Sequence, residues 1–387
     1  MPRTIYSLLV AIDDYPSPIP KLRGCVNDID AFATYLSERV AKDKGVALKL
    51  KTLKNGEATR AAVVDAFRGH LGQATKGDIA LFYYSGHGSQ EQTPEEFWEL
   101  EPDHLDETLV CFDSRRPGSW DLADKEMAKL IGEVAAQGAH LAVILDCCHS
   151  GSGTREIGTV TRRAPTDLRR RPIESFLVSP AEVEAAASSR AVSTSSAGWY
   201  ASPEGRHVLF AACRDDEEAK EYTGDGKHRG AFSFFLGDAL KGAAGVPTYR
   251  DLFARASALV SSQVANQSPQ LEAARNDDLD ATFLDGALQP SPATFTARFQ
   301  NGQWSINAGA TNGIPAPVGA DAARLALFRF DAPADDLREP VKAVAMARVE
   351  EVLPSSSRLT IEGNAALDTK LTYKALIISM PTPPLGV

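Results

Sequence analysis

The sequence predicts an α/β fold, a three-layer α/β/α sandwich with a mostly parallel central sheet, followed by a small C-terminal all-β module. Over roughly the first 285 residues, strand-like and helix-like segments alternate, which is typical of a parallel sheet covered by helices. Several strand-like segments are continuous apolar runs, as expected for strands buried on both faces. After Leu288 the chain changes to short alternating runs separated by Gly, Pro and Asn, which is typical of a β module.

The expected elements follow one another in a regular order. The strongly apolar segments, expected as buried strands, are 6–12, 78–84, 140–145 and 206–213. Segment 47–53 alternates apolar and polar residues, as a strand near a sheet edge would, and 108–112 is a short candidate strand. Amphipathic patterns predict helices over 27–40, with Asn27 as N-cap, and over 59–71, 124–136, 232–240 and 249–264.

We expect two domains, a larger one over 1–287 and a β-rich module over 288–387. An insert over 150–200 has no clear periodicity and is rich in Ser, Ala, Arg and Pro. A structureless insert of this length in a compact domain is usually functional or disordered. The expected strands of the module are 295–299, 304–308, 325–330, 341–349, 359–361 and 371–378.

The composition argues against several functional classes. The net charge is −10, and the lysines and arginines are scattered, so we expect no nucleic-acid partner. No apolar stretch approaches the length of a membrane span, and the apolar run 5–12 is too short for a secretory signal. The five cysteines are irregularly spaced and two are adjacent, unlike a disulfide framework. We therefore expect a reducing, cytoplasmic setting and no membrane association.

Two reactive side chains follow expected buried strands. His87, in YSGHG, comes after 78–84, and Cys148, in DCCHSG, comes after 140–145. Because the carboxyl ends of neighbouring parallel strands meet at one edge of a sheet, we expect the two side chains to share a site. A thiol beside an imidazole is an activated nucleophile, and the imidazole can protonate the leaving amine. The N–H groups of Gly88 and Cys148 could form an oxyanion hole, in which each donor contributes roughly 3–4 kcal/mol.

Simpler interpretations of the same residues stay open. A single cysteine at a strand end is more often a small buried apolar residue, and a histidine beside glycine is more often a turn residue. Cys147 and His149 could belong to a zinc site, although adjacent cysteines fit one tetrahedral ion poorly. A catalytically silent scaffold or signalling protein on the same fold is a further alternative.

A resemblance to a known family joins these observations. The segments LRGCVND (22–28), YYSGHG (83–88), DETLV (106–110), DCCHSG (146–151) and AACRDD (211–216) together resemble the metacaspases, including the bacterial forms called orthocaspases, over about 5–284. Caspases carry a Gln-Ala-Cys-x-Gly box instead. The resemblance implies a caspase-like α/β/α sandwich and a cysteine endopeptidase with Cys148 as nucleophile and His87 as its acid–base partner. Cys147 would then be a packing residue.

The resemblance also implies an acidic S1 pocket that accepts Arg or Lys, built from Cys25, Asp28, Ser85 and Asp146. The residues themselves support this, because carboxylates beside a nucleophile are costly unless they meet a cation. A guanidinium between two carboxylates meets that need. The alternative is that Asp28 caps a helix and Asp146 orients a loop.

Many metacaspases bind calcium through several aspartates, and this chain departs from that pattern. The expected Asp-Asp pair reads Asp124-Lys125, and the position after the cysteine box reads Gly153-Thr-Arg155. Calcium requires several oxygen ligands, and Lys or Arg would repel it. We therefore expect no metal or other cofactor.

The insert offers candidate processing sites, which are Arg162, Arg163, Arg169, Arg170 and Arg190. These are the P1 residues that an acidic pocket prefers, and an aperiodic segment predicts an extended, accessible backbone. Arg171 is a poorer site because Pro172 follows it. We therefore expect a zymogen, cleaved by itself or by an upstream protease, that acts on proteins or peptides with a basic P1 residue. The alternative is a tolerant surface loop without a regulatory role.

Overall fold

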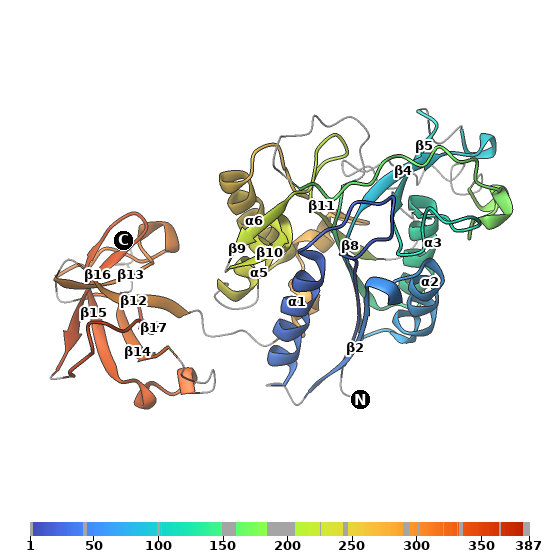
Figure 1. Ribbon diagram of the computed structural model, residues 1–387. Helices are drawn as coiled ribbons and strands as arrows, with labels where there is room; N and C mark the ends of the chain where they lie inside the picture. Colours follow the sequence, from blue (N-terminus) through green and yellow to red (C-terminus); the bar gives the residue numbers. More distant parts are fainter. Residues whose placement is uncertain are drawn as a thin grey trace. The chain divides into compact units, whose positions relative to one another are not determined.

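The computed structural model (Figure 1) describes residues 3–41, 45–98, 101, 103–148, 160–183, 206–224, 226–242, 247–288, 294–300, 302–319, 321–330, 332, 336–363 and 365–381. The chain divides into two units, residues 1–240 with 246–289 and residues 290–387 with 241–245. Each unit is described by itself below.

The first unit is built on a six-stranded sheet in the order β11-β8-β7-β3-β1-β2. Its strands are β1 (Arg3–Ala11), β2 (Val46–Lys54), β3 (Ile79–Ser85), β7 (His140–Asp146), β8 (His207–Ala211) and β11 (Gln270–Ala273). All neighbours from β2 to β8 are parallel, whereas β11 is antiparallel at one edge. The continuous apolar runs occupy the middle of the sheet, where β3 is buried along its whole length.

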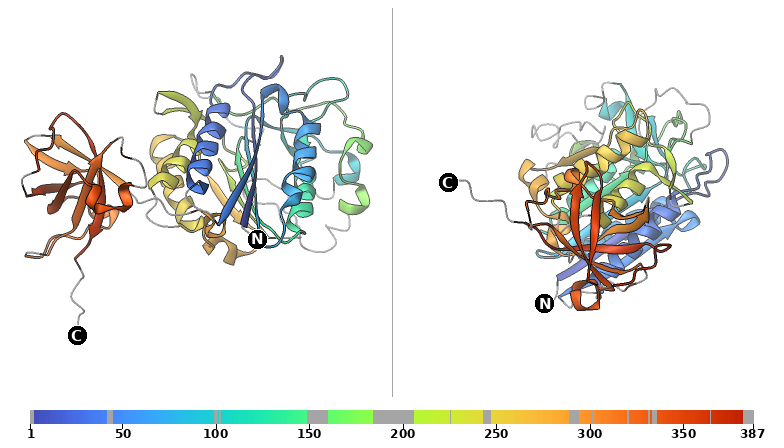
Figure 2. Two further views of the ribbon diagram at one scale, coloured as in Figure 1. Left: turned by 90° about the horizontal axis from the view of Figure 1, so that it is seen from below. Right: turned by 90° about the vertical axis from the view of Figure 1, so that its left-hand side faces the viewer.

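Helices cover both faces of this sheet. They are α1 (Cys25–Val40), α2 (Arg60–Gly69), α3 (Asp124–Ala135), α5 (Ala231–Gly242) and α6 (Tyr249–Gln263). Seen from below in Figure 2, α1, α5 and α6 lie on one face, and α2 and α3 lie on the other. The α/β/α sandwich with a mostly parallel sheet is therefore confirmed. Among the helices that the structure describes, none has the length and apolar character needed to cross a membrane.

Two local predictions were wrong. Helix α1 begins at Cys25, with Gly24 as N-cap, and not at Asn27. The carboxylate of Asp13 accepts the N–H groups of Cys25 (2.8 Å) and Val26 (3.1 Å), so a distant residue satisfies the helix start.

The strand expected at 108–112 is instead β5 (Leu105–Leu109), in an antiparallel sheet between β4 (Gly88–Gln92) and β6 (Leu122–Ala123). The sequence did not predict β4 because its residues, GSQEQ, are polar without alternation.

The second unit contains a closed antiparallel barrel in the order β12-β13-β16-β15-β14-β17. Its strands are β12 (Thr294–Gln300), β13 (Gln303–Ile306), β14 (Arg324–Arg329), β15 (Ala345–Val352), β16 (Ser357–Glu362) and β17 (Tyr373–Ser379). Alternate residues such as Leu325, Leu327, Ala347 and Val349 fill its core. The predicted all-β module is thus confirmed.

Candidate active site

The ends of β3 and β7 bring His87 and Cys148 to one edge of the sheet. The two strands pair in parallel with Ser85 opposite Asp146. His87 and Cys148 therefore each lie two residues beyond a matched strand end. The N–H of Gly86 donates to the carbonyl of Asp146 at 3.4 Å, which continues the pairing into the turn.

His87 is fully buried and held on several sides. Its Nε2 lies 2.8 Å from the carbonyl oxygen of Pro20; since a carbonyl only accepts, Nε2 carries the proton in this hydrogen bond. Tyr15 accepts the His87 N–H at 2.9 Å and packs its ring 4.8 Å from the imidazole. Nδ1 is buried without a hydrogen-bond partner. Burial lowers the pKa of His87 to about 4, so the imidazole is neutral at pH 7 and can accept a proton at Nδ1.

Cys148 is also buried. Its backbone N–H and the backbone N–H of Gly88 donate to the same oxygen atom. The carbonyl oxygen of Arg162 accepts the N–H of Gly88 at 3.0 Å and the N–H of Cys148 at 3.1 Å. The sulfur of Cys148 accepts the N–H of Ala219 at 2.8 Å. A carbonyl beside a thiol and held by two backbone donors has the arrangement of a scissile carbonyl in an oxyanion hole.

The side chain of the same arginine lies in a carboxylate-lined pocket. Arg162 has no solvent exposure. Its Nη1 donates to Ser85 Oγ at 2.7 Å and lies 3.3 Å from Asp146 Oδ2. Its Nη2 donates to Asp28 Oδ2 at 2.7 Å. The structure thus brings Asp28, Ser85 and Asp146 together around one guanidinium.

The charges of the pocket depend on this guanidinium. Burial raises the pKa of Asp28 to about 7, and Arg162 opposes that rise. Burial also raises the pKa of the Cys25 thiol well above its ordinary value, again opposed by Arg162. Without a cation, ionised carboxylates here would carry a large desolvation cost.

Three further residues complete the pocket and were missed from the sequence. They are Glu221, the first residue of β9 (Glu221–Gly224), Gly230, the last residue of β10 (Lys227–Gly230), and Ser233 of α5. Glu221 Oε1 lies 3.9 Å from Arg162 Nη2, and Ser233 donates N–H and O–H to Asp146 Oδ2. No sequence signal marks these residues, because they come from a hairpin and a helix that follow the insert.

Gly230 leaves room for the guanidinium. A Cβ atom at this position would lie 2.1 Å from Asp146 Oδ2 and 2.5 Å from Arg162 Nη1. Its N–H also donates to both carboxylate oxygens of Asp28, at 3.1 and 3.0 Å. A side chain at position 230 would therefore close the pocket.

The chain around Arg162 is extended and held from both sides. On one side, Arg162 N–H donates to Ala219 O at 2.9 Å. On the other, Ala164 and Asp167 donate to Gly88 O (2.9 Å) and Gln90 O (2.7 Å) of β4. In Figure 1 this segment runs from β9 past β4 toward α3. Strand addition of this kind is how many proteases and peptide-binding domains hold a peptide.

The other candidate processing residues lie elsewhere. Arg163 is half-buried, with Nη1 3.9 Å from Glu218. Arg169 pairs with Asp167 and stacks 4.5 Å from the Trp120 ring, and Arg170 is exposed. Arg190 lies outside the described residues, as do His149 of the possible zinc cluster and Arg155.

The expectation of an accessible segment is wrong for Arg162, and Arg171, which the sequence already made the poorer candidate, is buried as well. Arg162 is buried in the pocket, and the side chain of Arg171 is buried between Glu91 (2.6 Å) and Glu126 (2.8 Å). The physical reason is that buried carboxylates are stabilised when a guanidinium group pairs with them. A local sequence pattern does not show which arginine forms such a pair.

Comparison with known proteins finds a family similarity in the part of the chain that carries His87 and Cys148. Residues 6–155 match the family model described as metacaspase, peptidase C14 domain, and this stretch includes both His87 and Cys148. Residues 6–155 are therefore similar to the metacaspase peptidase domain. Metacaspases of this family are cysteine peptidases. The resemblance inferred from the motifs is therefore confirmed.

Several curated metacaspases of fungi are similar to this chain. Metacaspase-1A of Aspergillus oryzae is 33% identical over 149 residues, which is 38% of this chain and 34% of that protein. Metacaspase-1 of Schizosaccharomyces pombe is 31% identical over 148 residues, 38% of this chain and 33% of the relative. The chain thus spans about a third of the length of these relatives. Metacaspase-1 of Mycosarcoma maydis is 24% identical over 304 residues, 72% of each chain.

Among solved structures, the chain is similar to a protein of Geobacter sulfurreducens. The identity is 24%, the TM-score is 0.48, and the alignment covers 72% of this chain and 97% of that protein.

Proposed function

We propose that this protein is a cysteine endopeptidase that cleaves after Arg or Lys and restrains itself as a zymogen through Arg162. One observation carries the proposal, namely that Arg162 fills the carboxylate pocket while its carbonyl accepts the N–H groups of Gly88 and Cys148. This is the position of the P1 residue of a bound substrate. The insert therefore occupies the site that a substrate would need.

The proposed reaction uses groups already at that position. The thiol proton of Cys148 passes to His87 Nδ1, and the sulfur attacks the carbonyl carbon of Arg162. The resulting oxyanion is held by the N–H groups of Gly88 and Cys148. The imidazolium then protonates the amide nitrogen of Arg163, which leaves, and water releases the acyl group from sulfur. Substrates in trans would follow the same path once the pocket is free.

A catalytically silent scaffold on the same fold is the competing proposal. A scaffold does not require a backbone oxyanion hole, a buried neutral histidine and a carboxylate pocket around one arginine. Hydrolysis of short peptides decides between the two, because a scaffold would turn over none of them.

The specificity prediction concerns the P1 residue. Fluorogenic peptides should be cleaved after Arg, then after Lys, and not after Asp. Asp28→Ala and Asp146→Ala should each lower kcat/KM for Arg substrates about thirtyfold or more, because truncating one partner of a buried charge pair costs about 2 kcal/mol or more. Asp30→Ala is the matched control, since Asp30 lies on the same helix and is exposed. A preference for acidic P1 residues would reject the pocket.

We also propose that calcium is not required. Among the described residues, the carboxylates of Glu101, Asp106 and Asp124 form a group that could hold a metal ion. The ammonium of Lys125 lies among them, 2.5 Å from Glu101, 2.7 Å from Asp106 and 3.5 Å from Asp124. Burial alone would lower the pKa of Lys125, but the three carboxylates raise it well above its ordinary value. A permanent cation therefore already balances these charges, and calcium does not fit.

The calcium prediction follows from that internal cation. Peptide hydrolysis should be unchanged, within about twofold, between excess chelator and millimolar calcium. Lys125→Met should lower the free energy of unfolding by about 3–5 kcal/mol, because it strands buried carboxylates. The same change at Lys129 on α3, which is a quarter exposed, should cost less than about 1 kcal/mol. Steep activation of the unaltered protein by calcium would contradict this prediction.

A further inference from the structure

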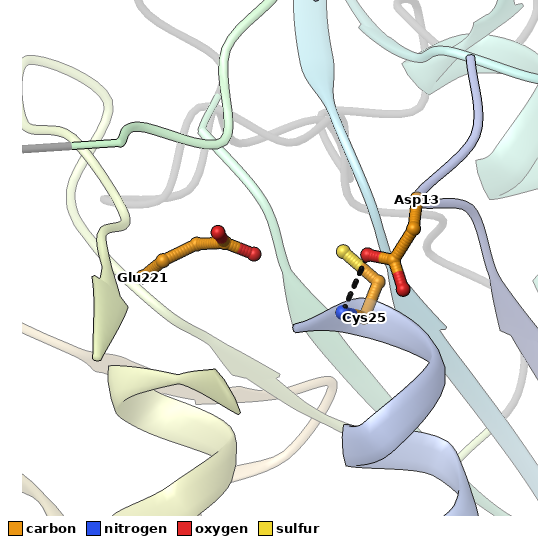
Figure 3. A group of neighbouring side chains, drawn as sticks. All are labelled: Asp13, Cys25 and Glu221. Atoms are coloured by element: carbon orange, nitrogen blue, oxygen red, sulfur yellow. Dashed lines mark hydrogen bonds between the residues drawn. The ribbon is translucent and has the colours of Figure 1, made fainter. Parts of the chain in front are cut away.

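A second group of potential metal ligands lies beside the Arg162 pocket. It consists of Asp13 after β1, Cys25 at the start of α1 and Glu221 at the start of β9. One ligand atom from each, two carboxylate oxygens and the sulfur, lie within 4.8 Å of one another. Figure 3 shows the Cys25 sulfur between the two carboxylates.

The hydrogen bonds of these residues leave ligand capacity unused. Glu221 Oε1 accepts the N–H groups of Arg23 (3.0 Å) and Gly24 (2.7 Å). Glu221 Oε2 is buried without a hydrogen-bond partner, on a side chain that is only 5% exposed. Burying a carboxylate oxygen without a partner costs free energy, which a cation or a hydrogen-bond donor can offset. Glu221 Oε2 is therefore available to bind a cation.

The cation that now faces this cluster is the guanidinium of Arg162, 3.9 Å from Glu221 Oε1. The same guanidinium pairs with Asp28 and Asp146. When Arg162 leaves, the carboxylates around the pocket lose their common counter-ion. The vacated pocket then favours any cation that fits, whether a basic side chain or a metal ion.

We propose that Asp13, Cys25 and Glu221 bind a thiophilic divalent cation such as zinc when Arg162 is out of the pocket, and that this cation and a basic P1 side chain exclude each other. Zinc takes thiolate and carboxylate ligands together, whereas calcium and magnesium take oxygen alone. Binding transfers the Cys25 thiol proton to the buffer. The proposal rests on the proposed function only in taking the Arg162 pocket, which this cluster adjoins, as the S1 pocket.

The test uses the full chain with Cys148→Ala, which removes the reactive thiol, combined with Arg162→Ala, which empties the pocket. Co²⁺ should give a thiolate-to-cobalt charge-transfer band, and calorimetry should show one Zn²⁺ bound per chain. Adding Cys25→Ser should abolish the band and weaken Zn²⁺ binding by about 10–100-fold. Glu221→Gln should weaken it similarly, and provides a second variant if Cys25→Ser does not fold by circular dichroism.

The Cys148→Ala chain with Arg162 intact is the matched control. It keeps Cys111, Cys147 and Cys213 but should bind neither metal in the pocket. Three outcomes would each overturn the proposal. The control could bind metal as well as the Arg162→Ala chain does, the charge-transfer band could persist after Cys25→Ser, or the Arg162→Ala chain could bind no metal. A peptide ending in arginine should displace Co²⁺. If the Cys148→Ala, Arg162→Ala chain binds cobalt through Cys25 but does not bind the arginine peptide, the metal site stands and the proposed function is rejected.

Discussion

Cys148→Ala is expected to abolish peptide hydrolysis, with a loss on the order of 10⁶-fold that brings turnover below detection. In the proposed reaction the Cys148 sulfur forms the acyl intermediate with the Arg162 carbonyl, and alanine has no group that could replace it. His87→Ala should lower kcat by several orders of magnitude, because neither the thiol nor the leaving amine would then exchange a proton with the enzyme. Both losses are measured with an Arg-P1 fluorogenic peptide.

Cys147→Ser provides the matched control for this prediction. Cys147 is buried, and the proposed reaction does not use its sulfur. We expect Cys147→Ser to retain hydrolysis within a few-fold. If Cys147→Ser lost peptide hydrolysis and Cys148→Ala retained it, the nucleophile would have been assigned to the wrong thiol.

The second large effect is expected at the bond between Arg162 and Arg163. The wild-type chain should convert into two fragments, one ending at Arg162 and the other beginning at Arg163, and Cys148→Ala should stay intact. Arg162→Ala should abolish this cleavage, because alanine cannot bridge Asp28 and Asp146. Gel electrophoresis with mass spectrometry of the fragment ends measures both outcomes.

Neighbouring arginines provide the controls for the cleavage site. Arg163→Ala and Arg169→Ala keep the residue in the pocket and should still be cut after Arg162. Arg162→Lys keeps the charge but loses the planar fork that reaches Ser85 and Asp28 at 2.7 Å each, so cleavage should be slower. Fragments that end at Arg169 or Arg170 while the 162–163 bond stays intact would reject Arg162 as the processing site. So would full activity of a chain that remains uncut.

Local sequence patterns were sufficient to predict the central sheet and the edge at which the candidate site lies. The apolar runs of β3 and β7 could be recognised because strands buried on both faces tolerate few polar residues. Because neighbouring parallel strands end at the same edge of a sheet, the sequence alone predicted that His87 and Cys148 would lie near each other. Polar β4 could not be recognised, because its pairing with β5 and with the insert depends on long-range partners.

The residues of the carboxylate pocket around Arg162 divide in the same way. Asp28 and Asp146 belong to motifs that can be recognised in the sequence. Glu221, Gly230 and Ser233 belong to none of these motifs. Glycine is needed at position 230 because a Cβ atom there would lie 2.1 Å from Asp146 Oδ2 and 2.5 Å from Arg162 Nη1. That requirement arises when a hairpin about 70 residues further along the chain folds against the insert, and a close approach of this kind leaves no local pattern.

The sequence determined the class of fold, the edge of the sheet that carries the chemistry, and the arginines available in the insert. The tertiary structure alone decided which arginine enters the pocket. Arg162 and Arg163 are identical in type and adjacent in sequence, yet the first has no exposure and the second is half-buried. Successive side chains of an extended segment point in opposite directions. The register of this segment on β4 therefore directs Arg162 toward Asp28 and Asp146, and that register depends on backbone hydrogen bonds between residues far apart in the chain.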